Sequence, residues 1–277
     1  MAVEIFIARA DGTQKFPIPN AIDVNQKILS PENIKETLPI NEWLRAFSKL
    51  LDSNPDDDTF RSMMKKNNSA GLWKKRPDEL DRLDVVVQEW PHRETVGNDI
   101  YSVIQNLSTE AHLLNGVNYL SSSKRIGIKK ALRTAAFFHD IAKVNDVADI
   151  RHPQHSADMV ESYLRTMNFT AQEIWLCYFL IKNHDLIGKT VNPKDTTEVS
   201  KLVDICHGFP SILQCLGALT IADISSIPGL KRINPNIISD VNQAIKLAYK
   251  EISNRNAKKG NPSYNLPNNN IRLFPFY

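Results

Sequence analysis

Histidine and aspartate side chains that can ligate a metal ion recur through the middle of the chain. The candidate ligands are His112, His139, Asp140, His152, His184 and Asp223, with Asp185 as a further carboxylate beside His184. Imidazole and carboxylate ligands without thiolates suit divalent Mn, Fe, Co, Ni, Zn or Mg, so the ligand types do not select one ion. The pattern predicts a centre for one or two divalent ions, built from several separate segments.

Hydrophobic periodicity indicates that two of these candidates lie on buried helix faces. His184 falls on the apolar face of a predicted helix over 171–185, and Asp223 does the same on a predicted helix over 210–225. An unpaired aspartate on a buried face is improbable, because moving a carboxylate out of water is costly. A metal ion or another cation is therefore expected to meet Asp223. A core histidine linked to Asp140 is the alternative interpretation of His139.

A second set of side chains could bind an anion beside these ligands. His139, Asp140 and Lys143 crowd one sector at the end of a predicted helix over 126–144. His152 precedes a proline and is predicted at a helix N-terminus, where free N–H groups attract anions. His155 and Lys182 are candidate substrate contacts, although either could simply be a surface residue.

The elements expected to position these side chains are helices. We predict helices over 98–120, 126–144, 153–167, 171–185, 197–206, 210–225 and 236–254. The first 20 residues are expected to form a β-hairpin, and a helix is expected near 39–51. Charge runs within 52–83 are interpreted as solvated loops and helix ends. The fold class is thus mainly α, with an N-terminal extension (1–95: hairpin plus helix), a helical domain (96–254) and a C-terminal tail (255–277).

Composition narrows the class of protein. The 277 residues are 42% hydrophobic and 23% charged, which is ordinary for a globular chain, and the net charge is +3. A dedicated DNA-binding protein is usually more basic. Three cysteines without a CxxC spacing indicate a reducing compartment. The absence of a basic, apolar leader and of a run of about 20 apolar residues predicts a cytoplasmic protein without a membrane span.

The order of the candidate ligands resembles that of the HD phosphohydrolase superfamily: His, His-Asp, one or two further histidines, and a closing Asp. Four segments within 98–226 carry the resemblance: AAFFHDIAKV, RHPQHSADMVESYL, IKNHDLIG and TIADISS. The resemblance implies that His112, His139, Asp140 and Asp223 ligate one metal, and that Asp140 bridges to a second metal held by His152 and His184. Asp185 stands where many two-metal members have histidine. We therefore expect an asymmetric centre whose first site fills before the second.

The activity that this resemblance implies is hydrolysis of a phosphoester or phosphoanhydride, with a nucleotide or dinucleotide favoured over a nucleic-acid end. Asp140 and Lys143 are then the candidate catalytic residues: Asp140 orients the water, and Lys143 directs its charge at the phosphate. The ligand order and the HDIAK motif are most similar to those of small two-metal hydrolases of dinucleoside polyphosphates. The alarmone-hydrolase branch has a Glu-Asp pair where this chain has Val144-Asn145-Asp146. Two other interpretations stay open: a di-iron oxygenase using the same ligands, and a non-catalytic, metal-stabilised module that binds a nucleotide or a partner.

Overall fold

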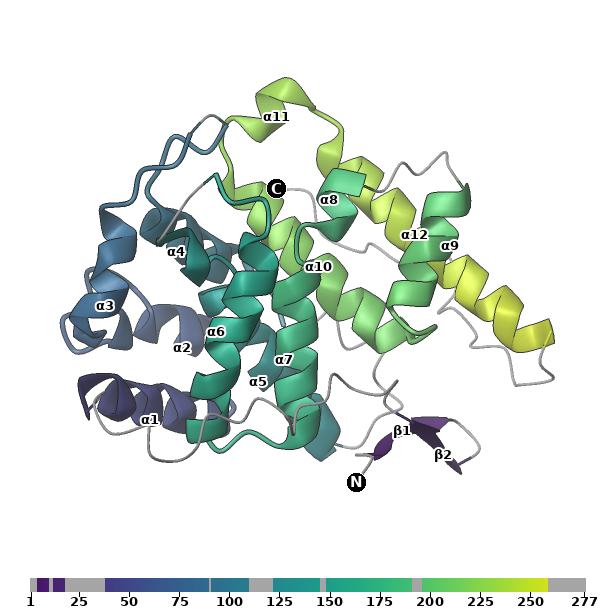
Figure 1. Cartoon of the computed structure of the whole chain (residues 1–277), viewed down its shortest axis with the longest axis horizontal. Helices are drawn as coiled ribbons and strands as arrows, with labels where there is room; N and C mark the ends of the chain where they lie inside the picture. Colours follow the sequence, from purple (N-terminus) through teal and green to yellow (C-terminus); the bar gives the residue numbers. More distant parts are fainter. Residues whose placement is uncertain are drawn as a thin grey trace.

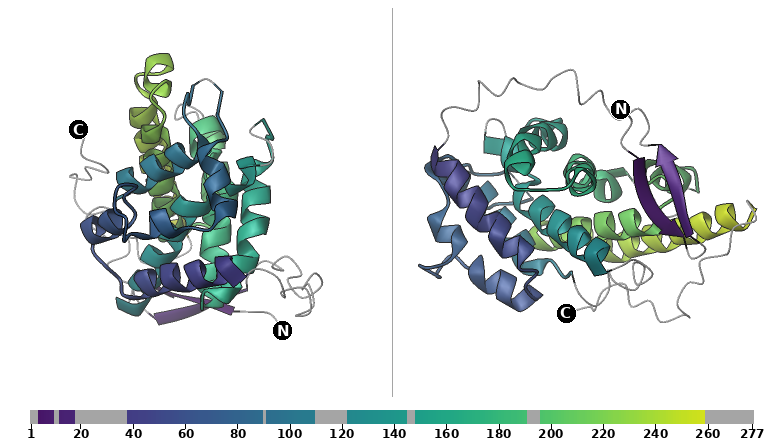
Figure 2. Two further views of the ribbon diagram at one scale, coloured as in Figure 1. Left: turned by 90° about the vertical axis from the view of Figure 1, so that its left-hand side faces the viewer. Right: turned by 90° about the horizontal axis from the view of Figure 1, so that it is seen from below.

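A computed structural model describes residues 4–9, 12–17, 38–89, 91–109, 122–144, 148–190 and 196–258, and it is mainly helical (Figures 1 and 2). Two strands, β1 (Glu4–Arg9) and β2 (Gly12–Pro17), pair antiparallel with Ile5 opposite Phe16. The predicted N-terminal hairpin stays a prediction, because residues 10–11, which would form its turn, lie outside the described residues.

The other elements are α-helices, interrupted by short 3₁₀ helices denoted η. In chain order they are α1 (Leu38–Asp52), α2 (Asp57–Met63), η2 (Leu72–Lys75), α3 (Asp78–Asp81), η3 (Arg82–Asp84), α4 (Val96–Asn106), α5 (Ser122–Phe138), η5 (Ile141–Val144), α6 (His152–Thr166), α7 (Ala171–Asn183), α8 (Leu186–Thr190), α9 (Thr196–Ile205), α10 (Pro210–Ser226), α11 (Leu230–Ile233) and α12 (Ile237–Lys258).

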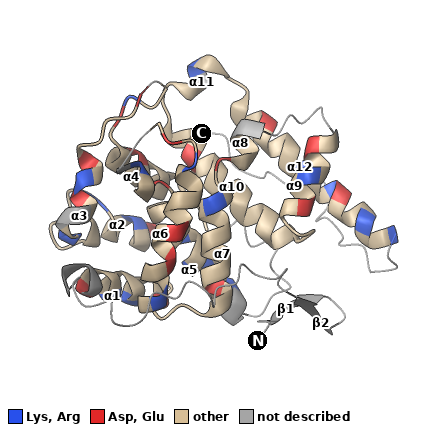
Figure 3. Ribbon diagram, viewed as in Figure 1, with Lys and Arg blue, Asp and Glu red and all other residues tan. Residues whose placement is uncertain are grey.

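Helix α10 lies at the centre of the bundle. It packs against α4 and α12 and also contacts α5 and α7, while α7 packs against α5 and α6. Fifteen of its 17 residues are buried, and Asp223 is its one charged residue. A Cβ at Gly217 would lie 2.5 Å from Cδ1 of Ile245, so a larger residue there would displace the end of that side chain on α12. Figure 3 shows both signs of charge along α9 and α12. The single carboxylate of α10, that of Asp223, is buried.

Helix α1 shares this core. The Trp43 ring lies 5.0 Å from Phe137 of α5, and the Phe47 ring lies 6.3 Å from Phe138. The indole N–H of Trp43 donates to the Leu72 carbonyl at 2.9 Å, so the polar tip of the buried ring is satisfied. Part of the predicted N-terminal extension thus packs against the helix that leads to His139-Asp140. A domain boundary near residue 95 remains a prediction.

The predicted single helix over 98–120 is wrong in its extent. Helix α4 ends at Asn106, and Leu107 has an extended backbone with ψ 127°. Contacts with α2 divert the chain: Arg61 donates to the Leu107 carbonyl at 2.6 Å, and the Thr109 N–H donates to Asp57 at 2.7 Å. Residues 110–121, which include His112, lie outside the described residues.

Two of the charges expected to be solvated are buried. Asp57 lies 2.8 Å from the guanidinium of Arg133, which is 1% exposed. Arg76 is held by Asp81 at 2.8 Å and by Asp84 at 2.5 Å. The charge-run interpretation is wrong for these two residues because ionic partners, one 76 residues away and the others within eight residues, compensate the loss of water.

The cysteines and helix lengths add two observations. Cys177, Cys206 and Cys215 are buried free thiols. Within the described part of the chain, no single helix has the length and apolar character to cross a bilayer. The segments Thr197–Ile205 and Pro210–Ser226 meet that test only as a pair bent by 106°.

Replacing Asp57 with alanine should lower the free energy of unfolding by about 3–5 kcal/mol, because it leaves the buried Arg133 guanidinium without its ionic partner. Urea denaturation followed by circular dichroism measures the change. The matched control is Asp58→Ala: the Asp58 side chain is 97% exposed, and its pair with Arg61 should be worth less than about 1 kcal/mol. Equal destabilisation by the two substitutions would contradict the assigned role of Asp57.

Candidate metal centre

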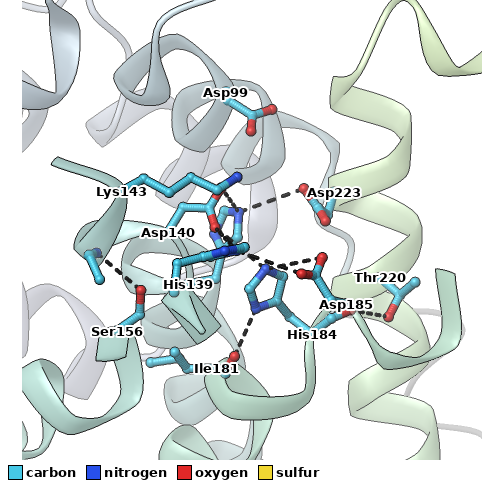
Figure 4. A network of polar contacts seen from close by, with 12 residues as sticks. Asp99, His139, Asp140, Lys143, Ser156, Ile181, His184, Asp185, Thr220 and Asp223 are labelled. Carbon is cyan, nitrogen blue, oxygen red and sulfur yellow. Dashed lines mark hydrogen bonds and ion pairs between the residues drawn. The ribbon is translucent and has the colours of Figure 1, made fainter. Parts of the chain in front are cut away.

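The His139-Asp140 pair lies in a turn between α5 and η5, not on the continuous helix predicted over 126–144 (Figure 4). Two contacts explain why the α-helix stops at Phe138. The His139 ring bonds to the Ala136 carbonyl, and the Ala142 N–H donates to the Ser156 hydroxyl at 3.1 Å. Side chains thus replace the backbone partners of a further helical turn, which aims both residues into the interior.

Five of the six predicted ligands converge on this turn from four directions. Nε2 of His139 lies 3.6 Å from Asp140 Oδ2 and 3.7 Å from Asp223 Oδ1. Asp140 Oδ1 lies 3.1 Å from His152 Nε2 and 3.5 Å from His184 Nε2. All five residues are buried, and they form two overlapping groups that could hold an ion: His139, His184 and Asp223, and Asp140, His152 and His184.

The three rings are oriented in the same way. Each bonds through Nδ1 to the backbone carbonyl three residues earlier: His139 to Ala136 (3.0 Å), His152 to Asp149 (2.9 Å) and His184 to Ile181 (2.7 Å). A carbonyl can only accept, so Nδ1 carries the proton and Nε2 of the neutral ring presents its lone pair to the cluster. Metal-ligating histidines are commonly oriented by such a hydrogen bond.

Unsatisfied buried atoms test whether a metal fits. Nε2 of His139, Nε2 of His152 and Oδ1 of Asp140 are buried without a hydrogen-bond partner among the residues that the structure describes. Buried polar atoms are otherwise nearly always paired. His139 and His152 belong to different groups, so one divalent cation in each group would satisfy these atoms. The imidazole and carboxylate ligands match the chemistry of such ions. The buried His/Asp groups could therefore bind a metal.

Helix ends add to the attraction for a cation. Helices α5 and α7 both end at the cluster. Helix α5 ends at Phe138 and is followed by His139, and α7 ends at Asn183 and is followed by His184. The C-terminal end of a helix carries partial negative charge from carbonyls without helical partners. Two such ends therefore face the space into which the imidazole Nε2 atoms point.

Without a metal, protons and Lys143 balance the carboxylates. Burial lowers the pKa of His139, but the charges of Asp140 and Asp223 outweigh it and raise that pKa to about 9. Burial raises the pKa of Asp140, but Lys143 and His139 outweigh it and hold it well below its ordinary value. Burial lowers the pKa of Lys143, and the Asp140 charge more than offsets this, raising it to about 12. A bound cation would take the place of the His139 proton.

The remaining predicted residues lie nearby or at the surface. Asp185 Oδ1 is 3.5 Å from His184 Nε2, and Asp185 Oδ2 is 3.6 Å from His152 Nε2. His155 is half-buried and pairs with Asp149 at 2.6 Å. Lys182 is exposed, with its ammonium 6.0 Å from the Tyr178 ring centroid. Substrate contacts by His155 and Lys182 stay predictions, and His112 falls in the undescribed stretch.

The sequence interpretation missed Asp99, which is 1% exposed and forms a third group with His139 and Asp140. A signal for it existed. Asp99 is three residues after Val96 and four before Val103, so it lies on the buried stripe of α4. The periodicity that identified Asp223 could have identified it as well.

Comparison with known proteins gives partial support to the resemblance to HD-domain hydrolases. No protein-family model matches the chain. The chain is similar to the bifunctional uridylyltransferase/uridylyl-removing enzyme of Zymomonas mobilis, with 34% identity over 109 residues. The match covers 38% of this chain and 11% of that protein's length. A helical fold with a buried His/Asp cluster also fits the resemblance to the HD superfamily.

Titration of metal-stripped protein with Mn²⁺ should show binding and a rise in melting temperature, because an ion that binds only the folded state stabilises it. His139→Ala should remove the tighter of the bound ions, and His152→Ala should weaken only a second one. His207→Ala is the control, since His207 is exposed on the turn after α9. Calorimetry gives stoichiometry and affinity. Identical Mn²⁺ isotherms for the His139→Ala variant and the unmutated protein would rule out this centre.

Proposed function

We propose that the protein is a metal-dependent phosphohydrolase that cleaves a phosphoester or phosphoanhydride of a nucleotide. The observation that carries the proposal is a set of buried ligand atoms beside a buried ammonium. Nε2 of His139, Nε2 of His152 and Oδ1 of Asp140 have no hydrogen-bond partner among the described residues, and the Lys143 ammonium lies 2.6 Å from Oδ2 of Asp140. Donors for a metal next to a fixed positive charge suit a phosphoryl group, whose charge must be stabilised during transfer.

The residues take separate roles in this proposal. Divalent ions supply an acidified water and a clamp for phosphoryl oxygens. His112, His139, Asp140 and Asp223 would hold one ion, and His152 and His184 a second one bridged by Asp140, with Asp185 as an added carboxylate. The Asp140 carboxylate would also accept a hydrogen bond from the attacking water and orient it. Lys143 presents its charge to the phosphate, while His155 and Lys182 contact the substrate from outside the cluster.

The Zymomonas relative supports the substrate class. Its name includes removal of a uridylyl group, and such a group is a nucleotide joined through phosphate. The proposal therefore includes two kinds of substrate. One is a nucleotidyl phosphodiester, and the other is a dinucleoside polyphosphate, which the sequence of the His-Asp motif favours. The helical region 96–254 would carry the activity, with 1–95 and 255–277 as flanking segments.

A substrate screen with metal-loaded protein tests the proposal. The panel contains mononucleotides, dinucleoside polyphosphates, cyclic nucleotides, short RNA ends and the p-nitrophenyl ester of UMP, each with Mn²⁺, Fe²⁺, Co²⁺, Ni²⁺, Zn²⁺ and Mg²⁺. Release of phosphate, of a nucleotide product or of nitrophenol is expected for at least one combination of substrate and ion. Tight nucleotide binding without turnover would favour a binding module, and a mixed-valence iron signal without hydrolysis would favour an oxygenase.

Asp140→Ala should reduce turnover of any hydrolysed substrate to background, because the substitution removes a shared metal ligand and the acceptor that orients water. Lys143→Met should lower kcat/KM about 10- to 100-fold, the value of one hydrogen bond to a charged group. Lys201→Met, on the exposed face of α9, is the charge-matched control. Initial rates with the best substrate of the screen give the comparison. Unchanged rates for the Lys143→Met variant would remove Lys143 from the mechanism.

A further inference from the structure

A chain of buried polar contacts joins the cluster to α4 through Gln88. The ammonium of Lys143 donates to Asp140 Oδ2 at 2.6 Å and to Gln88 Oε1 at 3.0 Å. The other end of the same amide, Gln88 Nε2, donates to Asp99 Oδ2 at 3.2 Å. Gln88 is 6% exposed, so water does not compete for these contacts. The order of the contacts is therefore Asp140, Lys143, Gln88, Asp99.

The chemistry of the four groups fixes the direction of the amide. A carboxylate only accepts hydrogen bonds and an ammonium only donates them, whereas an amide has one end of each kind. Gln88 must therefore turn its oxygen to Lys143 and its nitrogen to Asp99. Ser226 also donates to Asp99, and His92 Nδ1 lies 3.3 Å from it, so Asp99 is itself held in place.

The backbone around Gln88 is arranged to deliver this side chain. The Gln88 N–H donates to the Glu94 carbonyl and the Val96 N–H donates to the Val86 carbonyl, both at 2.9 Å. Val87 pairs with Thr95 in an isolated antiparallel bridge. Side chains alternate along such a segment, so the exposed Val87 leaves Gln88 facing inward.

We propose that Gln88 is a positioning residue that aims Lys143 at a phosphoryl oxygen, and that Asp99 fixes the orientation of the Gln88 amide. Lys143 has three N–H bonds, and two of them are directed to Asp140 and Gln88. Tetrahedral geometry then fixes the third, which is available to a substrate oxygen. Without Gln88, the ammonium can rotate toward Asp140 alone. The phosphoryl part of this inference rests on the proposed phosphohydrolase function.

The first test substitutes methionine, which matches glutamine in length and has no amide. In Mn²⁺-loaded protein, Q88M should raise the Kd for inorganic phosphate about tenfold, the value of one charge-assisted hydrogen bond, with little change in the Kd for Mn²⁺. A Q88M/K143M double variant should bind phosphate no more weakly than K143M alone. Q105M is the matched control, because Gln105 lies on α4 and donates only weakly, at 3.5 Å, to the Arg61 carbonyl. Additive losses in the double variant would overturn the proposal.

The second test reverses the polarity of the amide. Q88E keeps an acceptor for Lys143 but places a carboxylate against Asp99, so it should weaken phosphate binding. Adding D99N supplies a donor in place of that carboxylate, and Q88E/D99N should recover most of the phosphate affinity. A purely structural role would not produce this recovery. A double variant as weak as Q88E would overturn the role of Asp99.

A measurement that needs no substrate separates the positioning role of Gln88 from the proposed phosphohydrolase function. In the metal-free protein, hydrogen exchange of the Lys143 ammonium measured by ¹⁵N NMR should be about tenfold faster in Q88M, since one hydrogen bond to a charged group is lost. Exchange should slow again in Q88E/D99N. Equal exchange rates in Q88M and the unmutated protein would overturn the positioning role. Failure of the Mn²⁺-loaded, unmutated protein to bind phosphate would instead count against the proposed function and against the phosphoryl target of Lys143.

Discussion

The buried carboxylate of Asp140 sets the strongest physical requirement in this molecule. It is 1% exposed, and a carboxylate without water must be compensated by positive charge or hydrogen bonds. Lys143 approaches one oxygen at 2.6 Å, and two imidazoles lie within 3.5 Å of the other. The two oxygens thus face different surroundings. One is neutralised by the protein itself, and the other faces rings whose lone pairs need a cation.

The helical core brings these groups together. Helix α10 carries Asp223 on an apolar face, and His184 directly follows the last residue of α7. Helix α5 ends at Phe138, directly before the His139-Asp140 turn. Interiors at crystal-like packing density tolerate little change in volume. Substitutions deep in α10, where Gly217 permits the contact with Ile245, would therefore change ligand separations at the cluster although they touch no ligand.

The burial of several residues of this cluster could be predicted from the sequence, for identifiable reasons. His184 and Asp223 could be placed inside because each falls on an apolar helical stripe, and the predicted fold is confirmed as mainly helical. The interruption of the helix at Phe138 could not be predicted, because it depends on contacts with Ala136 and Ser156 that compete with backbone hydrogen bonds. Gln88 left no periodic signal, since a bridged loop positions it. The burial of Asp57 depends on a partner 76 residues away.

The aromatic pair at the end of α5 connects the cluster to light absorption. Phe137 and Phe138 immediately precede His139, and both rings lie within 6.5 Å of the Trp43 ring. A movement of the His139 turn would therefore reach the Trp43 ring through two directly packed phenylalanines. With the other three tryptophans replaced, the buried indole of Trp43 would be an intrinsic optical probe of the cluster.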